Sequence, residues 1–444
     1  MEMEAWALIM FAVAVVVLLL GFPVAFSLGA VAMVFGTVFL GIEFLDLLPM
    51  RIWGIMTNFT LLAVPMFVFM GIILEKSGIA EELLETMGLL FGRVRGGLAV
   101  SIVAVGAMLA ATTGVVGATV VTMGIIALPA MLKHGYSPAL ASGTIAASGT
   151  LGQIIPPSII LILLGDVIGV PVGRLFMGAV TPGLLLIILF IIYILVHAWW
   201  RPHSAPVLSV DRLTHGEGVS LPVRFIKSLM PPLLLIVAVL GSIFFGIASP
   251  TESAAVGALG AMVLAALHRR LSLDRLRQAM YQTTRLTSMV FLILIGATAF
   301  GLVFRGMGGD LLVEDLMTSL PGGEWGFLAV SMLLIFVLGF FLDFLEICFI
   351  VVPILAPVAD TLGIDLLWFA VLVAVNLQTS FLTPPFGFSL FYLKAAAPES
   401  VTITHIYKGI IPFVFIQLLT LALLMVFPET SLWLPSWMDQ LMGF

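Results

Sequence analysis

Two proline pairs interrupt long apolar stretches of this sequence, and each pair follows a run of polar residues. Pro156-Pro157 follows Ser148 to Gln153, and Pro384-Pro385 follows Asn376 to Thr383. Because a proline ring has no amide donor and clashes with the preceding helical turn, carbonyl groups near each pair lose their helical partners. Such carbonyls and the nearby hydroxyls can coordinate a cation, while the N-terminus of the following helix attracts an anion. We therefore predict two unwound, ligand-binding segments; the alternative is a pair of proline kinks whose polar side chains only satisfy the backbone.

Two further groups of polar residues lie in the middle of the apolar stretches 97–132 and 326–359. The first group contains glycine and threonine, and the second contains Gly339, Asp343 and Glu346. Glycine allows a tight turn and polar atoms can line a wet cavity, so both stretches suit hairpins that enter and leave a membrane on one side. A buried acid in an apolar run is costly and usually functional, which favours a place near a coupling ion for the two acids. The alternative is that they cap a helix.

The composition identifies the environment that must hold these segments. Hydrophobic residues make up 61% of the 444 residues and charged residues 9%, whereas soluble chains carry roughly 25% charged residues. We therefore expect an all-α polytopic protein embedded in a lipid bilayer. The net charge is −6 and no basic block can neutralise a run of phosphates, so we expect no nucleic-acid partner. Acidic residues precede the first apolar segment, which indicates a membrane span and not a cleaved leader.

Ten apolar segments are candidate membrane spans. If 97–132 and 326–359 are re-entrant hairpins, fifteen of the 18 Lys and Arg residues fall on one side, leaving Arg51, Arg174 and Arg305 opposite. Because Lys and Arg in short loops stay in the cytoplasm, we expect both termini in the periplasm. A single crossing by 97–132 would divide the basic loops between the two sides, so hairpins are favoured. The candidate spans are residues 5–22, 24–41, 59–75, 139–168, 172–198, 229–247, 252–267, 287–304, 366–397 and 406–427.

An internal repeat relates the two halves of the chain. Pro156-Pro157 recurs 228 residues later as Pro384-Pro385, and Pro129 recurs at the same spacing as Pro357. An odd number of spans precedes residue 229, so the second half must be inverted relative to the first, as in transporters whose site lies at broken helices near the midplane. The predicted repeats are residues 1–228, with scaffold helices in 1–75, hairpin 97–132, broken helix 139–168 and helix 172–198, and residues 229–444, with scaffold helices in 229–304, hairpin 326–359, broken helix 366–397 and helix 406–427.

Signatures of enzymes are absent from the sequence. It contains no Gly-x4-Gly-Lys-Ser/Thr loop for ATP, and none of its 6 histidines belongs to a His-Glu-x-x-His zinc motif. The single cysteine, Cys348, has no second thiol for a disulfide or a zinc site. The remaining enzymatic alternative is an intramembrane aspartyl pair of Asp166 and Asp343, but Asp166 falls at the end of a predicted span. We therefore expect no catalysis and no organic cofactor.

Five residue runs are similar to a known family. In order along the chain, these runs resemble the large membrane (permease) subunit of TRAP (tripartite ATP-independent periplasmic) transporters, and in particular the subgroup labelled for mannitol or chloroaromatic compounds. The resemblance extends over essentially the whole chain. The runs are residues 128–138, 148–158, 176–183, 246–258 and 382–387.

This resemblance implies a sodium symporter of the bacterial inner membrane that imports a small organic acid. A periplasmic binding protein would deliver the substrate, and a small four-helix membrane subunit would brace the large one. It also implies an elevator mechanism, in which both hairpins and both broken helices move as one transport domain against a scaffold. Two alternatives stay open: a one-component sodium/dicarboxylate carrier, and a membrane scaffold or enzyme subunit without a transport cycle, against which the repeated broken helices argue.

Carried over position by position, the resemblance also implies two sodium sites. The sequence departs from the family at residues 113–115, where many members have Ser-Gly-Ser, and at Glu346, where many have Thr or Ala. The first site joins Thr112, Thr113, Gly114 and Val115 to Gly149, Thr150 and Gly152, and the second joins Gly339 and Asp343 to Gln378, Thr379 and Thr383.

A carboxylate substrate needs partners other than a buried guanidinium, because no arginine lies inside a predicted span. The helix N-termini after Pro157 and Pro385 supply partial positive charge, and the hydroxyls of Ser158 and Thr383 supply donors. We therefore expect these four residues to form the substrate site, together with the bound sodium ions.

Overall fold

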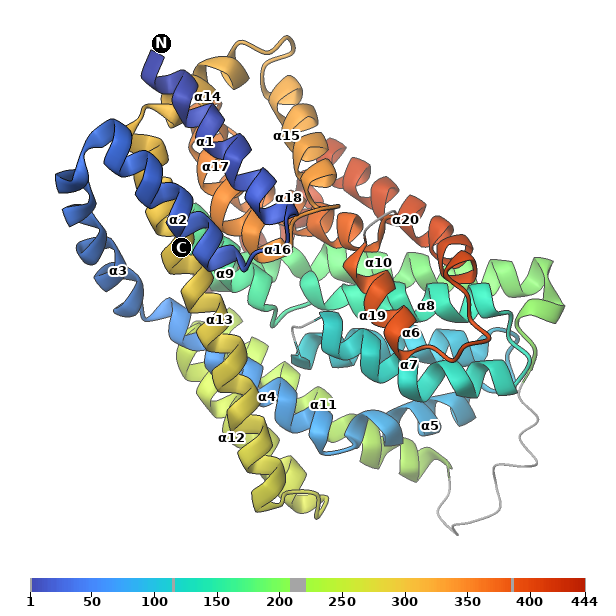
Figure 1. Cartoon of the computed structure of the whole chain (residues 1–444). Helices are drawn as coiled ribbons and strands as arrows, with labels where there is room; N and C mark the ends of the chain where they lie inside the picture. Colours follow the sequence, from blue (N-terminus) through green and yellow to red (C-terminus); the bar gives the residue numbers. More distant parts are fainter. Residues whose placement is uncertain (1, 114–115, 208–220, 385–386, 444) are drawn as a thin grey trace.

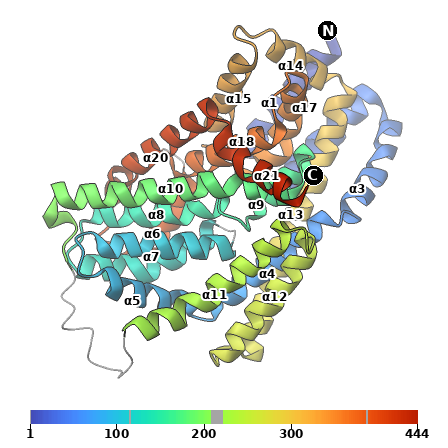
Figure 2. The ribbon, with the colours of Figure 1, turned by 180° about the vertical axis from the view of Figure 1, so that it is seen from behind.

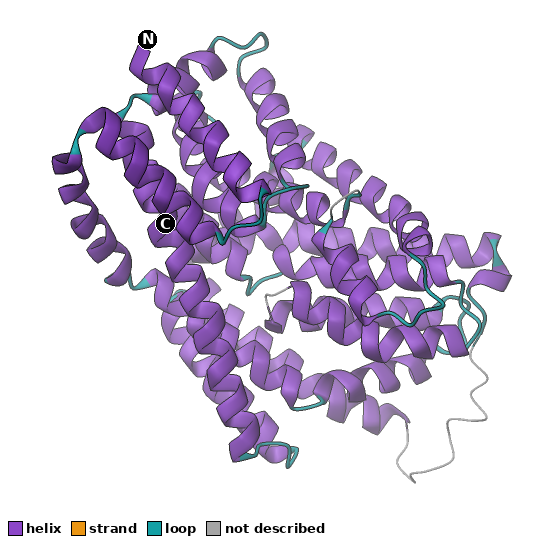
Figure 3. Ribbon diagram, viewed as in Figure 1, coloured by secondary structure: helices purple, strands orange, loops and turns teal. Residues whose placement is uncertain are grey.

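The computed structural model describes residues 2–113, 116–207, 221–384 and 387–443, and all regular secondary structure in these residues is helical (Figure 3). Short 3-10 or π-helical segments are η1 (Gly36–Leu40), η2 (Ile42–Leu47), η3 (Thr60–Leu62), η4 (Leu151–Gln153), η5 (Pro202–Ser204) and η7 (Ile347–Val351). The α-helices are α1 (Glu2–Leu19), α2 (Val24–Phe35), α3 (Leu48–Met56), α4 (Ala63–Lys76), α5 (Ile79–Phe91), α6 (Gly97–Thr113), α7 (Val116–Lys133), α8 (Pro138–Thr150), α9 (Ile159–Ile168), α10 (Val172–Trp200), α11 (Leu221–Phe244), α12 (Pro250–Leu267), α13 (Leu273–Gly306), α14 (Gly309–Thr318), α15 (Glu324–Leu338), α16 (Phe344–Glu346), α17 (Val352–Thr361), α18 (Leu366–Leu382), α19 (Phe388–Ala396), α20 (Ile403–Val426) and α21 (Glu429–Met442).

The expected all-α membrane fold is confirmed. In the described residues, 7 helices are long and apolar enough to cross a membrane, and a pair bent by 56°, Ile42–Met56 with Thr60–Lys76, gives an eighth candidate. Two hairpins are present: the first consists of α6 and α7, and the second of α15 followed by α16, η7 and α17. Two long helices are interrupted, α8/α9 at residues 151–158 (the first break) and α18/α19 at residues 383–387 (the second break).

Several helices occupy segments that the sequence analysis left as loops or omitted. α5 fills most of 76–96, and α3 lies between the second and third predicted spans. α13 begins at Leu273, inside a basic stretch expected to be a loop, because the Ser272 hydroxyl caps it by accepting a hydrogen bond from the Arg275 N–H. A search for about 18 consecutive apolar residues cannot detect helices that are apolar on one face only.

The two halves of the chain repeat the same order of elements. α4, α5, the first hairpin, α8, α9 and α10 correspond to α13, α14, the second hairpin, α18, α19 and α20. Gly78 before α5 and Gly308 before α14 both have positive φ, +72° and +76°, a conformation that favours glycine. The first hairpin enters from the end of the molecule where α5 ends, and the second from the end where α14 and the start of α1 lie (Figures 1 and 2). The two repeats are therefore inverted.

Glycines allow α8 and α20 to cross in backbone contact. A β-carbon at Gly143 of α8 would overlap the carbonyl group of Gly409 in α20, and one at Gly409 would overlap the carbonyl group of Ala139. Small residues at such crossings let membrane helices approach closely and gain van der Waals contact. This crossing joins the first broken helix to the last long helix of the second repeat.

We predict that Gly143→Ala and Gly409→Ala each lower the melting temperature of the purified protein. A methyl group at either position has only backbone atoms to displace, and overpacking of this kind costs about 1–3 kcal/mol or more. Gly241→Ala in α11 is the matched control, since a β-carbon there meets no atom within 4 Å. Equal melting temperatures for all three variants in a thermal unfolding assay would contradict this account of the crossing.

Candidate functional site

The two interrupted helices and the two hairpins meet near the centre of the molecule (Figure 1). η4, in the first break, packs against α6, α7, α9 and α18. The first hairpin also contacts the second repeat through α7 and α19, and the second hairpin contacts the first repeat through α17 and α9. A ligand held between the breaks would therefore be surrounded by elements of both repeats.

Hydroxyl groups satisfy part of the backbone that the first break releases. The Ser158 Oγ donates a hydrogen bond to the Gln153 carbonyl oxygen (2.8 Å), and the Thr150 Oγ1 donates to the Ala147 carbonyl oxygen (2.8 Å). A hydroxyl that donates its proton in this way keeps its oxygen lone pairs as acceptors. Both oxygens therefore remain able to coordinate a cation.

Gln153 lies in the same break and is not satisfied. Its side chain is fully buried, and within the described part of the chain neither its amide oxygen nor its amide nitrogen has a hydrogen-bond partner. An unpaired buried amide costs about 1–3 kcal/mol. Native proteins rarely keep such a group without a ligand, ion or water to pair with it.

The second break shows the same combination of paired hydroxyls and an unpaired amide. Thr379 Oγ1 donates to the Val375 carbonyl oxygen (2.8 Å), and Thr383 Oγ1 donates to the Thr379 carbonyl oxygen (2.7 Å). Gln378, one turn before the break, is fully buried, and both polar atoms of its amide lack partners among the described residues. An unpaired, buried glutamine amide therefore lies within the first break, and another lies one turn before the second.

The acids of the second hairpin form a helix cap. The Asp343 carboxylate accepts a hydrogen bond from the Phe344 N–H (2.7 Å), and the Glu346 carboxylate accepts one from the Asp343 N–H (3.1 Å). This reciprocal pair is a capping box at the start of α16. The capping alternative is thus confirmed, and it fixes the conformation of the hairpin tip without excluding an ion nearby.

Each hairpin lies against one of the breaks. A β-carbon at Gly149 would overlap Val120 of the first hairpin, and a β-carbon at Gly339 would overlap Ser380 beside the second break. The rings of Phe344 and Phe381 also meet, with centroids 6.1 Å apart. The structure thus brings the second hairpin's tip to the end of α18, and the first hairpin to the end of α8.

The expected site residues fall into three groups. Thr112 and Thr113 form the last turn of α6, Gly149 and Thr150 end α8, and Gly152 lies in η4. In the second group, Gly339 and Asp343 flank the turn of the second hairpin, and Gln378, Thr379 and Thr383 lie at the end of α18. In the third group, Ser158 directly precedes α9, and Pro157 beside it forms a cis peptide bond with Pro156. The expected residues Gly114, Val115 and Pro385 lie outside the described residues.

Sequence reasoning did not single out Gln153 and Gln417. Gln417 of α20 is fully buried, and its Nε2 donates a hydrogen bond to Thr150 Oγ1 (3.4 Å). The available signal for Gln417 was an isolated glutamine inside an apolar run, because such a group is costly to bury. The signal for Gln153 was its place at the end of the polar run before the first proline pair.

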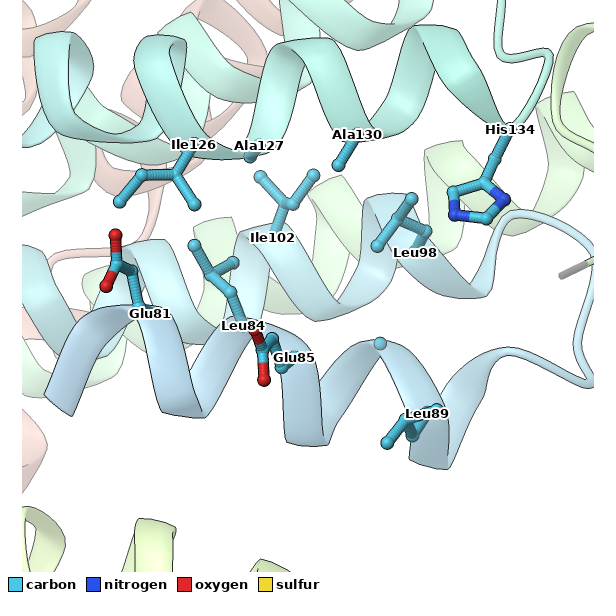
Figure 4. A pocket seen from close by; sticks show the side chains of 11 residues that line it. Glu81, Leu84, Glu85, Leu89, Leu98, Ile102, Ile126, Ala127, Ala130 and His134 are labelled. Atoms are coloured by element: carbon cyan, nitrogen blue, oxygen red, sulfur yellow. The ribbon is translucent and has the colours of Figure 1, made fainter. Parts of the chain in front are cut away.

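A separate cavity of about 360 Å³ lies between α5 and the first hairpin (Figure 4). Leu84, Leu98 and Ile102 contribute to its apolar walls, and Glu81 and Glu85 stand on its α5 side. Burial and the neighbouring Lys133 lower the pKa of His134, so this lining histidine is neutral at pH 7. The two carboxylates would repel an anion, so this cavity does not suit an organic acid.

The chemistry available at the breaks is that of neutral oxygen atoms. Among the described residues, no group of three or more His, Cys, Asp and Glu side chains is placed to hold a metal ion. Carbonyl, hydroxyl and amide oxygens at unwound helices suit a hard monovalent cation, while the partial positive charge of a helix N-terminus, such as that of α9, suits an anion. The Asp166 carboxylate at the end of α9 accepts a hydrogen bond from Asn58 Nδ2 (2.5 Å).

Comparisons with known proteins agree with this geometry. Residues 11–430 match the family "Tripartite ATP-independent periplasmic transporter, DctM component". The chain is 31% identical over 396 residues to the C4-dicarboxylate TRAP transporter large permease protein DctM of Pseudomonas aeruginosa, covering 88% of this chain and 90% of the relative. It is 30% identical to the ectoine TRAP transporter large permease protein TeaC of Halomonas elongata (96% and 98% covered) and 30% identical to the sialic acid TRAP transporter large permease protein SiaM of Vibrio cholerae (94% and 95% covered).

A solved structure shares the fold. The YdaH transporter of Alcanivorax borkumensis superposes with a TM-score of 0.63 at 15% identity, covering 94% of this chain and 98% of that one. The relatives are transport permeases and not enzymes, as expected from the sequence. The match over residues 11–430 shows that this chain belongs to the DctM family, the large permease subunits of TRAP transporters.

Proposed function

We propose that this chain imports a small organic acid across the bacterial inner membrane by symport with sodium ions. The observation that carries the proposal is the pair of breaks: each has buried hydroxyl oxygens and a buried, unpaired glutamine amide in or beside it, Gln153 in η4 and Gln378 in α18, and these two elements pack against each other. Neutral oxygen ligands of this kind replace the hydration shell of a monovalent cation.

The proposed sodium sites are those that the family resemblance implied. One uses the tip of the first hairpin with Gly149, Thr150 and Gly152; the other uses Gly339 and Asp343 with Gln378, Thr379 and Thr383. Support comes from the packing of α6 against η4 and of Gly339 against Ser380, which brings each hairpin to its partner segment. The carboxylate of the substrate would lie at the N-termini of α9 and α19, near Ser158 and Thr383.

The relatives support an acidic substrate. Their names specify C4-dicarboxylates, ectoine and sialic acid. All of these compounds carry a carboxylate group. We therefore assign a carboxylate-bearing organic acid as the substrate class of this chain.

The proposed assembly has three parts, as the family's description "tripartite" indicates. A periplasmic binding protein would deliver the substrate, and a small membrane subunit would brace the permease. With both termini in the periplasm, fifteen of the 18 Lys and Arg residues face the cytoplasm.

An elevator movement is the proposed transport step. The moving body would contain the two hairpins, the broken helices, α10 and α20, and the fixed body would contain α1 to α5 and α11 to α14. Polar contacts that bridge the two bodies are side-chain bonds at exposed or half-buried positions, such as Asn58 to Asp166 (2.5 Å) and Thr122 to Glu75 (3.1 Å). Such bonds can be exchanged for bonds to water at moderate cost.

We predict that uptake depends on a sodium gradient and not on ATP. Proteoliposomes that contain the permease with its membrane partner, supplied with the loaded binding protein, should accumulate substrate when sodium is present outside. Replacing sodium with choline should abolish uptake, and ATP should not restore it. Uptake of equal rate in choline would contradict sodium coupling.

We predict that Thr383→Val raises the sodium concentration required for half-maximal uptake by about tenfold, since a lost contact with a charged ligand costs about 1.5 kcal/mol. Thr284→Val is the matched control, because the Thr284 hydroxyl makes the same bond to the carbonyl four residues earlier (2.9 Å) but is exposed on α13. An identical sodium titration for the two variants would argue against this site.

We predict that Gln153→Leu abolishes uptake but keeps or raises the melting temperature. The melting temperature should not fall, because the substitution removes the desolvation cost of an unpaired buried amide. Uptake should be lost because the amide binds the ion or the substrate; if its role were purely structural, transport would stay intact. Gln282→Leu on the exposed face of α13 is the control and should retain uptake. Retained uptake in Gln153→Leu would show that this amide binds neither ion nor substrate.

A further inference from the structure

Two arginines line one cavity at the boundary between the proposed fixed and moving bodies. The cavity measures about 220 Å³ and is bordered by α3, α9, α13, η7 and α17. Arg51 of α3 and Arg305 of α13 contribute guanidinium groups, and Thr298 contributes a hydroxyl. The residues that line it, all within the described ranges, include no acidic side chain.

Cationic side chains are rare on the side of the protein where Arg51 and Arg305 lie. With the proposed orientation, Arg51, Arg174 and Arg305 are the only Lys or Arg residues of the sequence on the periplasmic side. Arg174 is paired with Asp439 of α21, with 2.6 Å between Nη2 and Oδ2. The other two cations of this side line the same cavity, although they lie in different repeats of the chain.

Each arginine has a simpler explanation when it is considered alone. Arg305 lies in the last turn of α13, where a cation complements the helix dipole. Arg51 lies on a helix whose exposed side chains include Met50 and Trp53, as expected at a membrane interface. Neither explanation requires the two groups to face one cavity, and neither supplies an acid to pair with them there.

The local contacts leave guanidinium donors available. The contact that Arg305 makes to the protein in this cavity is a long one, from Nη2 to the Pro353 carbonyl oxygen (3.4 Å). A guanidinium has five N–H donors in a planar fork that matches a carboxylate. Two such groups beside low-dielectric walls concentrate positive potential at the opening of the cavity.

We infer that this cavity is an entry site for the carboxylate of the transported acid, before the acid reaches the breaks. The inference rests on the proposed function for the orientation and for the acidic substrate. Both guanidinium groups are exposed, so the site captures the anion weakly and releases it easily. The function of the site is to raise the local concentration of the substrate, and coupling to sodium stays at the breaks.

The first test measures occupancy without transport. The full-length permease with its membrane partner, in phosphatidylcholine nanodiscs and without binding protein, is treated with phenylglyoxal, and modified arginines are quantified by mass spectrometry. Succinate and lactate should protect Arg51 and Arg305 but not Arg174, and the uncharged succinamide should protect none. Absence of protection by both acids would overturn the inference.

Other anions are distinguished in the same assay. Phosphatidylglycerol is added to the nanodiscs as an anionic lipid. If this lipid protects the arginines and succinate and lactate do not, the site binds lipid phosphate, and the inference is overturned. Protection by the binding protein alone would assign the arginines to a protein interface and would overturn it as well.

The second test measures transport in the assembled system. The double variant Arg51→Gln/Arg305→Gln should lower the rate of substrate uptake roughly three- to tenfold, the size expected for two exposed charge contacts. Its sodium concentration for half-maximal uptake should be unchanged, and Arg174→Gln should behave like the unmodified protein. An unchanged rate in the double variant would contradict the entry site.

The two proposals fail in different ways. If the unmodified protein shows no sodium-driven uptake, the proposed function is wrong, whereas the labelling result still decides whether the cavity binds carboxylates. If uptake requires sodium but neither acid protects the arginines, only the entry site is wrong.

Discussion

The structure depends on one constraint, which is that backbone groups inside a lipid bilayer must find partners within the protein. Each break releases carbonyls from a helical ladder, and short hydroxyl side chains pair with several carbonyls around the two breaks. Ser158 bonds to Gln153, Thr150 to Ala147, and Thr383 to Thr379. The hairpins pack against η4 and against the end of α18, so that they cover part of the irregular backbone. The residues that satisfy this constraint are therefore also those of the proposed ion and substrate sites.

Inversion of the repeats places each hairpin against a half-helix of the other repeat. α7 packs on α19, and α17 packs on α9. A ligand bound at either break would thus contact elements of both halves, and its binding would stabilise the contacts between the two halves. This arrangement explains why the two breaks need not carry identical residues: Thr150 and Gln378 occupy corresponding positions, but their side chains differ in size and in pairing.

The sequence was sufficient to predict features that have strong local causes. Proline pairs, glycine-rich turns and the asymmetry of Lys and Arg indicated the breaks, the hairpins and the inverted order. It was not sufficient for α3 and α5, which are apolar on one face only. It also did not predict the basic start of α13, where the capping hydrogen bond to the Ser272 hydroxyl determines the residue at which the helix begins. The burial of the unpaired Gln153 amide and the convergence of Arg51 and Arg305 on one cavity depend on tertiary contacts between distant segments. No spacing rule encodes such contacts.

The glycine crossing between α8 and α20 has a consequence for the surrounding membrane. Because the backbones touch, α20 cannot slide past α8, and the two must travel together in any movement of the central unit. α20 exposes Ile411 and Phe415, and α10 exposes Leu184 and Ile188, each with more than half of the side-chain surface accessible. Apolar surface of this extent would be carried along the bilayer normal with each cycle, which creates hydrophobic mismatch at one end of the stroke. In the proposed elevator movement, the thickness of the lipid bilayer would therefore influence the transport rate, independently of the ion and of the substrate.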